Sequence, residues 1–127
     1  MHQFEKLHIW QEGIELVAEI YQVTKTFPKE EMFGLTSQMR RSAVSIPTNI
    51  AEGACRNNVG EFRHFLGIAA GSTAELITLI HLAEKISLLD LAKADQLIEK
   101  LRSLQNRNFT LQQKVGDKKD QKQHRTG

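Results

Sequence analysis

The residues whose types and spacing could support chemistry are a glutamate–histidine pair, one cysteine and scattered histidines. Glu61 and His64 stand three residues apart, the spacing with which the helices of di-iron bundles supply metal ligands. A complete site needs two such motifs and two further glutamates that face the same core. Glu61 and His64 fall at the start of their predicted helix. A metal-dependent bundle enzyme is therefore a remote alternative, and no metal or other cofactor is expected.

Cys55 is the only cysteine, and it can form no disulfide within the chain. A cysteine nucleophile needs a partner base, and no histidine stands near Cys55 in a recognisable pattern. The sequence also has none of the glycine-rich loops that bind phosphates and no Gly-x-Ser-x-Gly turn. We therefore predict a non-catalytic protein with no catalytic residues, in which Cys55 occupies a small apolar site in a reduced, cytoplasmic setting.

The composition is that of a small helical protein. The 127 residues include 40% apolar and 25% charged side chains, but only 6% aromatic ones. A chain of this length can bury a core as one domain without disulfides or metals. No run of 18 apolar residues occurs, so we expect no membrane span.

Four segments have apolar residues at the three- and four-residue spacing of amphipathic helices: about 7–26, 37–55, 58–86 and 90–111. Short links between them favour antiparallel neighbours. The predicted fold class is all-α, an antiparallel up-down four-helix bundle over residues 1–113.

The boundaries and one interior position of these helices can also be predicted. Thr36, Asn58 and Asp90 are the expected N-caps of the second, third and fourth helices, because their side chains can accept hydrogen bonds from the first amides. Pro47 lies inside the second helix, where it removes one helical hydrogen bond. It predicts a kink, with a break into two helices as the alternative.

The last residues, 114–127, are almost all polar and predict a disordered tail, since they cannot bury enough apolar surface to order themselves. Residues 1–89 hold 8 Lys and Arg against 10 Asp and Glu, whereas residues 90–127 hold 9 against 5. The tail is therefore either a solvated end or an arm that contacts nucleic acid. The candidate contacts for RNA or another partner are Arg40, Arg41, Arg56, Lys118, Lys119, Lys122 and Arg125.

Three polar residues are candidates for structural pairing between helices: Asn49, Glu52 and Glu75. Glu75 falls inside the apolar arc of the third helix, and a buried carboxylate requires a partner. We expect Glu75 to be buried and hydrogen-bonded to the second helix, through Arg41 or Arg56. A polar stripe on the second helix is a solvated face, a subunit contact, or a contact with RNA or a protein partner. The residues of this stripe are Arg41, Ser45, Asn49, Glu52 and Arg56.

The third helix has more apolar surface than its neighbours in one bundle can cover. Its apolar arc spans roughly two-thirds of the circumference, against the ~100° or somewhat more that is typical of a surface helix. Small residues within the arc would let another helix approach closely. We therefore predict a homo-oligomer, with the contact candidates Leu66, Gly67, Ala70, Gly71 and Ile77.

Several stretches of the sequence resemble one known family. The most specific is residues 38–53, QMRRSAVSIPTNIAEG, and others are residues 4–10, 27–35 and 61–76. They resemble the four-helix-bundle family named for proteins encoded in intervening sequences of bacterial 23S ribosomal RNA genes. The resemblance covers about residues 4–89.

This resemblance implies an antiparallel four-helix bundle, a ring of five subunits and no known catalysis, with ribosomal RNA association suggested mainly by genomic location. A similar group, the accessory proteins of diversity-generating retroelements, binds a reverse transcriptase and nucleic acid through a strongly basic surface, whereas this chain is only +2. The resulting hypothesis is a non-catalytic, pentameric bundle protein whose partner is RNA or an RNA-bound protein. The alternative is a structural or interaction scaffold that binds no nucleic acid.

Overall fold

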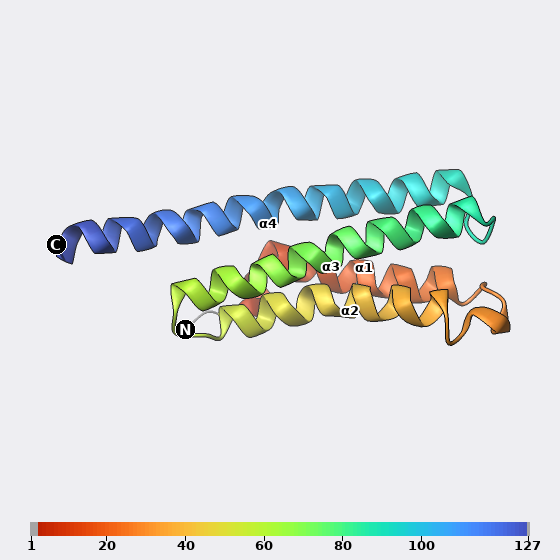
Figure 1. Ribbon diagram of the computed structural model, residues 1–127, viewed down its shortest axis with the longest axis horizontal. Coiled ribbons are helices and arrows are strands. Elements are labelled where there is room, and N and C mark those ends of the chain that lie inside the picture. Colours follow the sequence, from red (N-terminus) through yellow and green to blue (C-terminus); the bar gives the residue numbers. More distant parts are fainter. Residues whose placement is uncertain (1–2, 127) are drawn as a thin grey trace.

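The computed structural model describes the backbone of residues 3–126 and the side chains of residues 3–116. Within that part of the chain the structure is helical and has no strand. The elements are η1 (Phe4–Lys6), α1 (His8–Thr24), η2 (Lys29–Glu31), α2 (Leu35–Ala54), α3 (Val59–Lys85) and α4 (Leu91–Thr126). The four α-helices lie side by side, and each begins near the end of the bundle where the previous one stops (Figure 1). The predicted all-α four-helix bundle is confirmed.

The core lies where the apolar stripes of the four helices meet. The apolar stripe of α2 is buried throughout, and its members are Met39, Ala43, Ile46, Ile50 and Ala54. Fully buried side chains on the other helices are Ile20, Leu66, Leu76, Ile80, Leu97, Leu101 and Leu104. Burying one such leucine or isoleucine contributes about 1.5–3 kcal/mol, so this shared core holds the bundle together.

α2 continues without interruption through Pro47, so the alternative of two separate helices is wrong. Pro47 is buried against α1, where a β-carbon placed on Gly13 would lie 3.2 Å from the Pro47 Cβ. The absence of a side chain at position 13 therefore lets α1 approach the proline ring closely. The kink at Pro47 stays a prediction.

α3 and α4 begin at the caps that the sequence predicts. The Asn58 side chain accepts a hydrogen bond from the Glu61 amide at 3.0 Å. The Asp90 carboxylate accepts one from the Lys93 amide at 2.7 Å. Each cap satisfies a backbone donor that has no partner within its own helix, and so fixes where the helix starts.

The cap expected for α2 is wrong. Thr36 is buried inside the first turn, and α2 already begins at Leu35. The Glu31 carboxylate, from η2, accepts a hydrogen bond from the Leu35 amide at 3.2 Å. The Glu31 side chain, from the link before the helix, therefore accepts a hydrogen bond from the first turn of α2, which is the role that the sequence predicts for Thr36.

α3 is long and apolar enough to cross a bilayer by length and composition alone, with a mean hydropathy of 1.5 over an 18-residue window. The lack of an uninterrupted run of 18 apolar residues is therefore not enough to exclude a membrane-spanning helix. In the bundle α3 packs between α2 and α4, and 39% of that window is buried. The lack of a membrane contact stays a prediction.

α4 is helical to Thr126, past residue 111, where its apolar periodicity fades. Its C-terminal part extends beyond the end of the bundle at which α2 stops (Figure 1). The division into a bundle of residues 1–113 and a polar tail of residues 114–127 stays a prediction.

Candidate functional site

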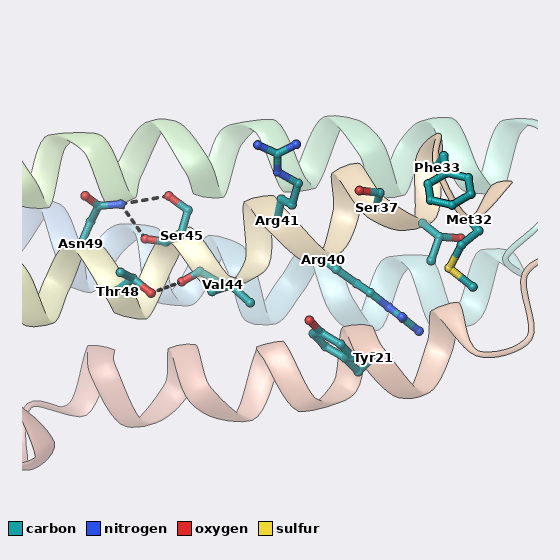
Figure 2. Close-up of a pocket in the computed structure, with 11 residues that line it drawn as sticks. Tyr21, Met32, Phe33, Ser37, Arg40, Arg41, Val44, Ser45, Thr48 and Asn49 are labelled. Atoms are coloured by element: carbon teal, nitrogen blue, oxygen red, sulfur yellow. Dashed lines mark hydrogen bonds between the residues drawn. The ribbon is translucent and has the colours of Figure 1, made fainter.

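A groove of about 720 Å³ runs over the outer face of α2 beside the end of α1. Its lining combines apolar side chains from α1 and from the link after it with polar side chains of α2 (Figure 2). The lining residues are Tyr21, Met32, Phe33, Thr36, Ser37, Arg40, Arg41, Val44, Ser45, Thr48 and Asn49. Two of the predicted RNA contacts, Arg40 and Arg41, therefore lie in one groove.

Arg40 is held in place by α1. Its Nε donates a hydrogen bond to the Thr24 Oγ1 at 2.9 Å, and its guanidinium carbon lies 4.5 Å from the centre of the Tyr21 ring. The Thr24 hydroxyl in turn donates to the Ile20 carbonyl oxygen at 2.7 Å. A cation above an aromatic face is stabilised by about 0.5–2 kcal/mol, so Arg40 is a structural link between α1 and α2 as well as a surface charge.

Arg41 and Arg56 differ from Arg40. Arg41 is exposed, points away from Arg40 (Figure 2), and has no hydrogen bond or ion pair with any residue of the described part. Arg56 stacks on Phe65, with 5.0 Å between the guanidinium carbon and the ring centre. It follows the far end of α2, roughly 22 Å from Arg41 at 1.5 Å per residue. Arg40 and Arg41 thus line one groove with their side chains pointing apart, and Arg56 lies away from both.

The remaining RNA candidates fall on the C-terminal part of α4. The side chains of Lys118, Lys119, Lys122 and Arg125 lie outside the described residues. Their role therefore stays a prediction.

Asn49 pairs within its own helix. Its side-chain amide donates to the Ser45 carbonyl oxygen at 2.8 Å and to the Ser45 Oγ at 2.9 Å. The Ser45 hydroxyl is 2.8 Å from that of Ser72 on α3. Asn49 thus supports a polar contact between α2 and α3 through Ser45, while Glu52 is exposed and pairs with no described residue.

The burial expected for Glu75 is wrong. Glu75 is exposed, and its carboxylate has no hydrogen bond or ion pair within the described part of the chain. The reason is the rotation of α3 about its axis, which turns Leu76 and Leu79 to the core. Glu75 then falls on the outward arc together with the exposed Ile68 and Leu82.

The expected oligomer contacts on α3 are divided between the core and the surface. Leu66 and Ala70 are buried, and their carbonyl oxygens accept hydrogen bonds from α4, so these two side chains are not available to a second subunit. Ile77 is half-buried against the core. Only Gly67 and Gly71 are exposed, and a β-carbon on either would meet no atom within 4 Å.

An apolar face on α1 and α2 is the feature that the sequence analysis missed. Ile14, Tyr21, Val44 and Met32 are exposed, and Phe33 is 97% exposed. A second hollow of about 370 Å³ shares Val44 and Thr48 with the groove and continues it along α1. Helical spacing groups the apolar residues of one helix into a stripe, but it does not tell which of them a neighbouring helix covers, and Met32 and Phe33 lie outside the helices.

The other chemical candidates are all at the surface. Glu61 and His64 are exposed, and so are Glu5 and His8, a second pair at the same spacing that the sequence analysis overlooked. No group of three or more His, Cys, Asp or Glu residues within the described chain is arranged to hold a metal ion. Cys55 is exposed, so its expected place in a small apolar site is wrong.

Two ion pairs link α1 and α4 at the surface of the bundle. Lys100 donates to the Glu19 carboxylate at 2.7 Å, and Arg107 forms an ion pair with Glu12. They surround a hollow of about 510 Å³. These four groups have charge partners, and Glu15 is the one further charged group that lines the hollow. The hollow therefore offers less unpaired charge than the groove on α2, which Arg40 and Arg41 line.

Comparison with known proteins places this fold in a family. Residues 5–109 match the family described as 23S rRNA-intervening sequence protein. A crystal structure of a protein with unknown function from the S23 ribosomal protein family of Bacteroides thetaiotaomicron is similar to this chain, with a TM-score of 0.77 and 17% sequence identity. The similarity covers 82% of this chain and 97% of the other. No curated protein matches the sequence. Because the match spans most of the bundle, the chain belongs to the family of 23S rRNA-intervening sequence proteins.

Proposed function

We propose that this chain is a non-catalytic, self-associating helical-bundle protein of the cytoplasm whose partner beyond itself is RNA or an RNA-bound protein. The observation that carries self-association is the apolar face formed by α1, α2 and the link between them, where Phe33 is 97% exposed beside Met32 and Tyr21. Soluble monomers rarely expose contiguous apolar patches of more than a few hundred Å², and larger ones usually mark contacts.

A ring is the form of assembly that the exposed surfaces support. A closed ring needs head-to-tail contacts between two different surfaces of the chain. Besides the face on α1 and α2, α3 exposes Ile68 and Leu82, and Ile86, directly after α3, is exposed as well. The number of five subunits comes from the family resemblance, and the two apolar surfaces are compatible with it.

Sedimentation velocity at micromolar concentration tests this assembly. The full chain is expected to sediment as rings of five subunits, single or paired, and Phe33→Ser to dissociate at higher concentration than the wild type because it removes an apolar contact. Phe109→Ser is the matched control, since Phe109 is an exposed phenylalanine on α4, outside the groove. A wild-type monomer would contradict self-association, whereas a dimer or tetramer would contradict only the number.

The distribution of charge indicates which end of the bundle RNA would contact. Residues 3–116 hold 13 Lys and Arg and 13 Asp and Glu, so the net +2 comes from residues 117–127. Arg56 follows the end of α2, and α4 extends beyond that same end (Figure 1). RNA is therefore expected at this end, with Arg40 and Arg41 contributing less.

Binding of a fluorescent stem from 23S ribosomal RNA, measured at low and moderate salt, tests the RNA contact. The affinity should fall steeply with salt, because each phosphate contact releases counterions. A chain that ends at residue 113 should bind more weakly and with a shallower salt slope, and so should Arg56→Gln. Arg102→Gln, an exposed arginine on α4, is the control that should bind like the wild type.

A scaffold that binds no nucleic acid is the second candidate. The equal numbers of positive and negative side chains over residues 3–116 favour it, because a neutral surface attracts phosphates weakly. An assembled wild type that fails to bind the RNA stem even at low salt would decide for the scaffold.

A further inference from the structure

Four side chains form a line along the outermost surface of α2, the α2 strip: Arg41, Ser45, Thr48 and Glu52. Their spacing of four, three and four places them within roughly a 60° arc at 100° per residue. Arg41 and Glu52 stand at its two ends, about 16 Å apart at 1.5 Å per residue, too far to pair with each other. Both are exposed, and neither has a hydrogen bond or ion pair with any described residue.

Burying the middle of the α2 strip against another chain should cost little free energy. The Thr48 hydroxyl donates to the Val44 carbonyl oxygen at 2.7 Å, and the Ser45 hydroxyl is bonded to that of Ser72 at 2.8 Å. A buried polar group is costly mainly when it has no partner. These two side chains are also short, so another helix could approach closely. The unsatisfied groups of the strip are therefore its two terminal charges.

We infer that two copies of this chain pair α2 against α2 through this strip, antiparallel about a two-fold axis. Such a contact uses the same patch on both copies. The α2 strip is self-complementary in this arrangement, because the midpoint of its outer pair, Arg41 and Glu52, coincides with the midpoint of its inner pair, Ser45 and Thr48. Both midpoints lie between residues 46 and 47, where the two-fold axis would pass. Arg41 of each copy then faces Glu52 of the other, and Ser45 faces Thr48.

Apolar side chains border the strip close to the axis. Gly13 lies against Pro47, so the neighbouring Ile14, which is exposed, lies level with the middle of the strip. Val44, also exposed, adjoins Ser45 on α2. Pairing of two copies brings these side chains towards their counterparts and buries apolar surface that one chain leaves in water.

This contact goes beyond the ring and beyond RNA binding. A ring of five needs head-to-tail contacts, for which Tyr21, Met32 and Phe33 are exposed away from the strip. The two-fold contact uses Ile14 and Val44 instead, so it joins copies in pairs in addition to any ring. The strip itself carries one positive and one negative charge. It therefore matches a second copy of itself better than it matches a phosphate backbone.

Charge reversal on the full chain tests the pairing, with mass measured by sedimentation velocity. In a pair of Arg41→Glu chains, a glutamate at position 41 faces Glu52 of the other copy at both ends of the strip. In a pair of Glu52→Arg chains, two arginines face each other at both ends in the same way. Each single variant is expected to halve the mass of the wild-type assembly and to raise the Kd of the pairing step at least about 100-fold. The double variant, and an equimolar mixture of the two single variants, should both return to the wild-type mass. Arg102→Glu and Glu99→Arg are matched controls on the exposed surface of α4 and should keep it.

The mixture makes the result specific to a contact between chains, because residues 41 and 52 of one chain are too far apart to pair. An assembled wild type whose mass ignores both reversals would overturn the pairing and leave the proposed self-association standing. A wild-type monomer would overturn both. If the masses stay unchanged and Arg41→Glu alone loses binding to a short RNA hairpin, the strip faces RNA and the pairing is wrong.

Discussion

The side-chain amide of Asn108 donates a hydrogen bond to the main-chain oxygen of Leu66 at 3.0 Å, in the buried interface between α3 and α4. Gln112 donates to the Asn108 Oδ1 at 2.9 Å, and Gln105 donates to the carbonyl oxygen of Ala70 at 2.9 Å, one turn further along α3. Apolar side chains would tolerate several alignments of two helices. This polar network therefore fixes the axial register of α4 relative to α3.

Removing the central amide should destabilise the bundle. Asn108→Ala is expected to lower the free energy of unfolding by about 1–3 kcal/mol, because the Gln112 amide loses its buried partner and a small cavity forms. Asn108→Asp should cost more, since a carboxylate would face a carbonyl oxygen. Urea denaturation followed by circular dichroism measures both. Asn106→Ala, at an exposed position on the same helix, should change stability by at most about 0.5 kcal/mol.

Gly53 is predicted to tolerate no side chain. A β-carbon at this position would lie 2.7 Å from the Cβ of Phe65 and 3.1 Å from the ring of Phe62 on α3. Gly53→Ala should therefore force α2 and α3 apart and cost about 1–3 kcal/mol in urea denaturation. Gly67→Ala is the control, because its β-carbon would meet open space within α3. It should stabilise the chain by about 0.4–1 kcal/mol, so equal losses in both variants would contradict the steric argument.

The features of the fold that the sequence predicts are those that depend only on residues of one helix and its cap. The spacing of Met39, Ile46 and Ile50 requires one buried face on α2, whichever helices cover it. Asn58 and Asp90 cap their helices through contacts with residues three positions away. Such local relationships can be predicted from the order of residues where one capping side chain is available, whereas α2 offers both Thr36 and Glu31 and the structure uses Glu31.

The parts that the sequence does not predict depend on which neighbour covers which side of a helix. α3 has apolar residues around most of its circumference, so periodicity cannot tell that Leu66 and Ala70 face α4 while Ile68 faces water. The same ambiguity hides the exposed face of α1 around Ile14, whose apolar residues fit a core stripe equally well. The polar side of the groove, with Arg41, Ser45 and Asn49, is among the residues that the sequence singles out. Its apolar side depends on these tertiary choices and cannot be predicted from the sequence.

Glu75 gives a direct test of this correction. A buried carboxylate paired with an arginine would make Glu75→Ala lose roughly 2–4 kcal/mol. Because the side chain is exposed and pairs with no described residue, the expected change is within about 0.5 kcal/mol. Urea denaturation of the variant and of wild type at the same protein concentration measures the difference. A loss near 2 kcal/mol would show that Glu75 is buried by a partner after all.

The ion pairs between α1 and α4 should contribute little to stability. Lys100 and Glu19 are 2.7 Å apart, but their side chains remain 46% and 28% exposed, where water and salt screen the attraction. A double-mutant cycle with Glu19→Gln and Lys100→Met isolates the pair, and a coupling energy of about 0.2–1 kcal/mol is expected. The coupling should shrink in high salt. The same cycle on Glu19 and Lys93, which do not form an ion pair, provides the baseline and should give a coupling near zero. A coupling that stays large in high salt would mean that this contact is desolvated, and that α4 is held on α1 by charge rather than through the shared apolar core.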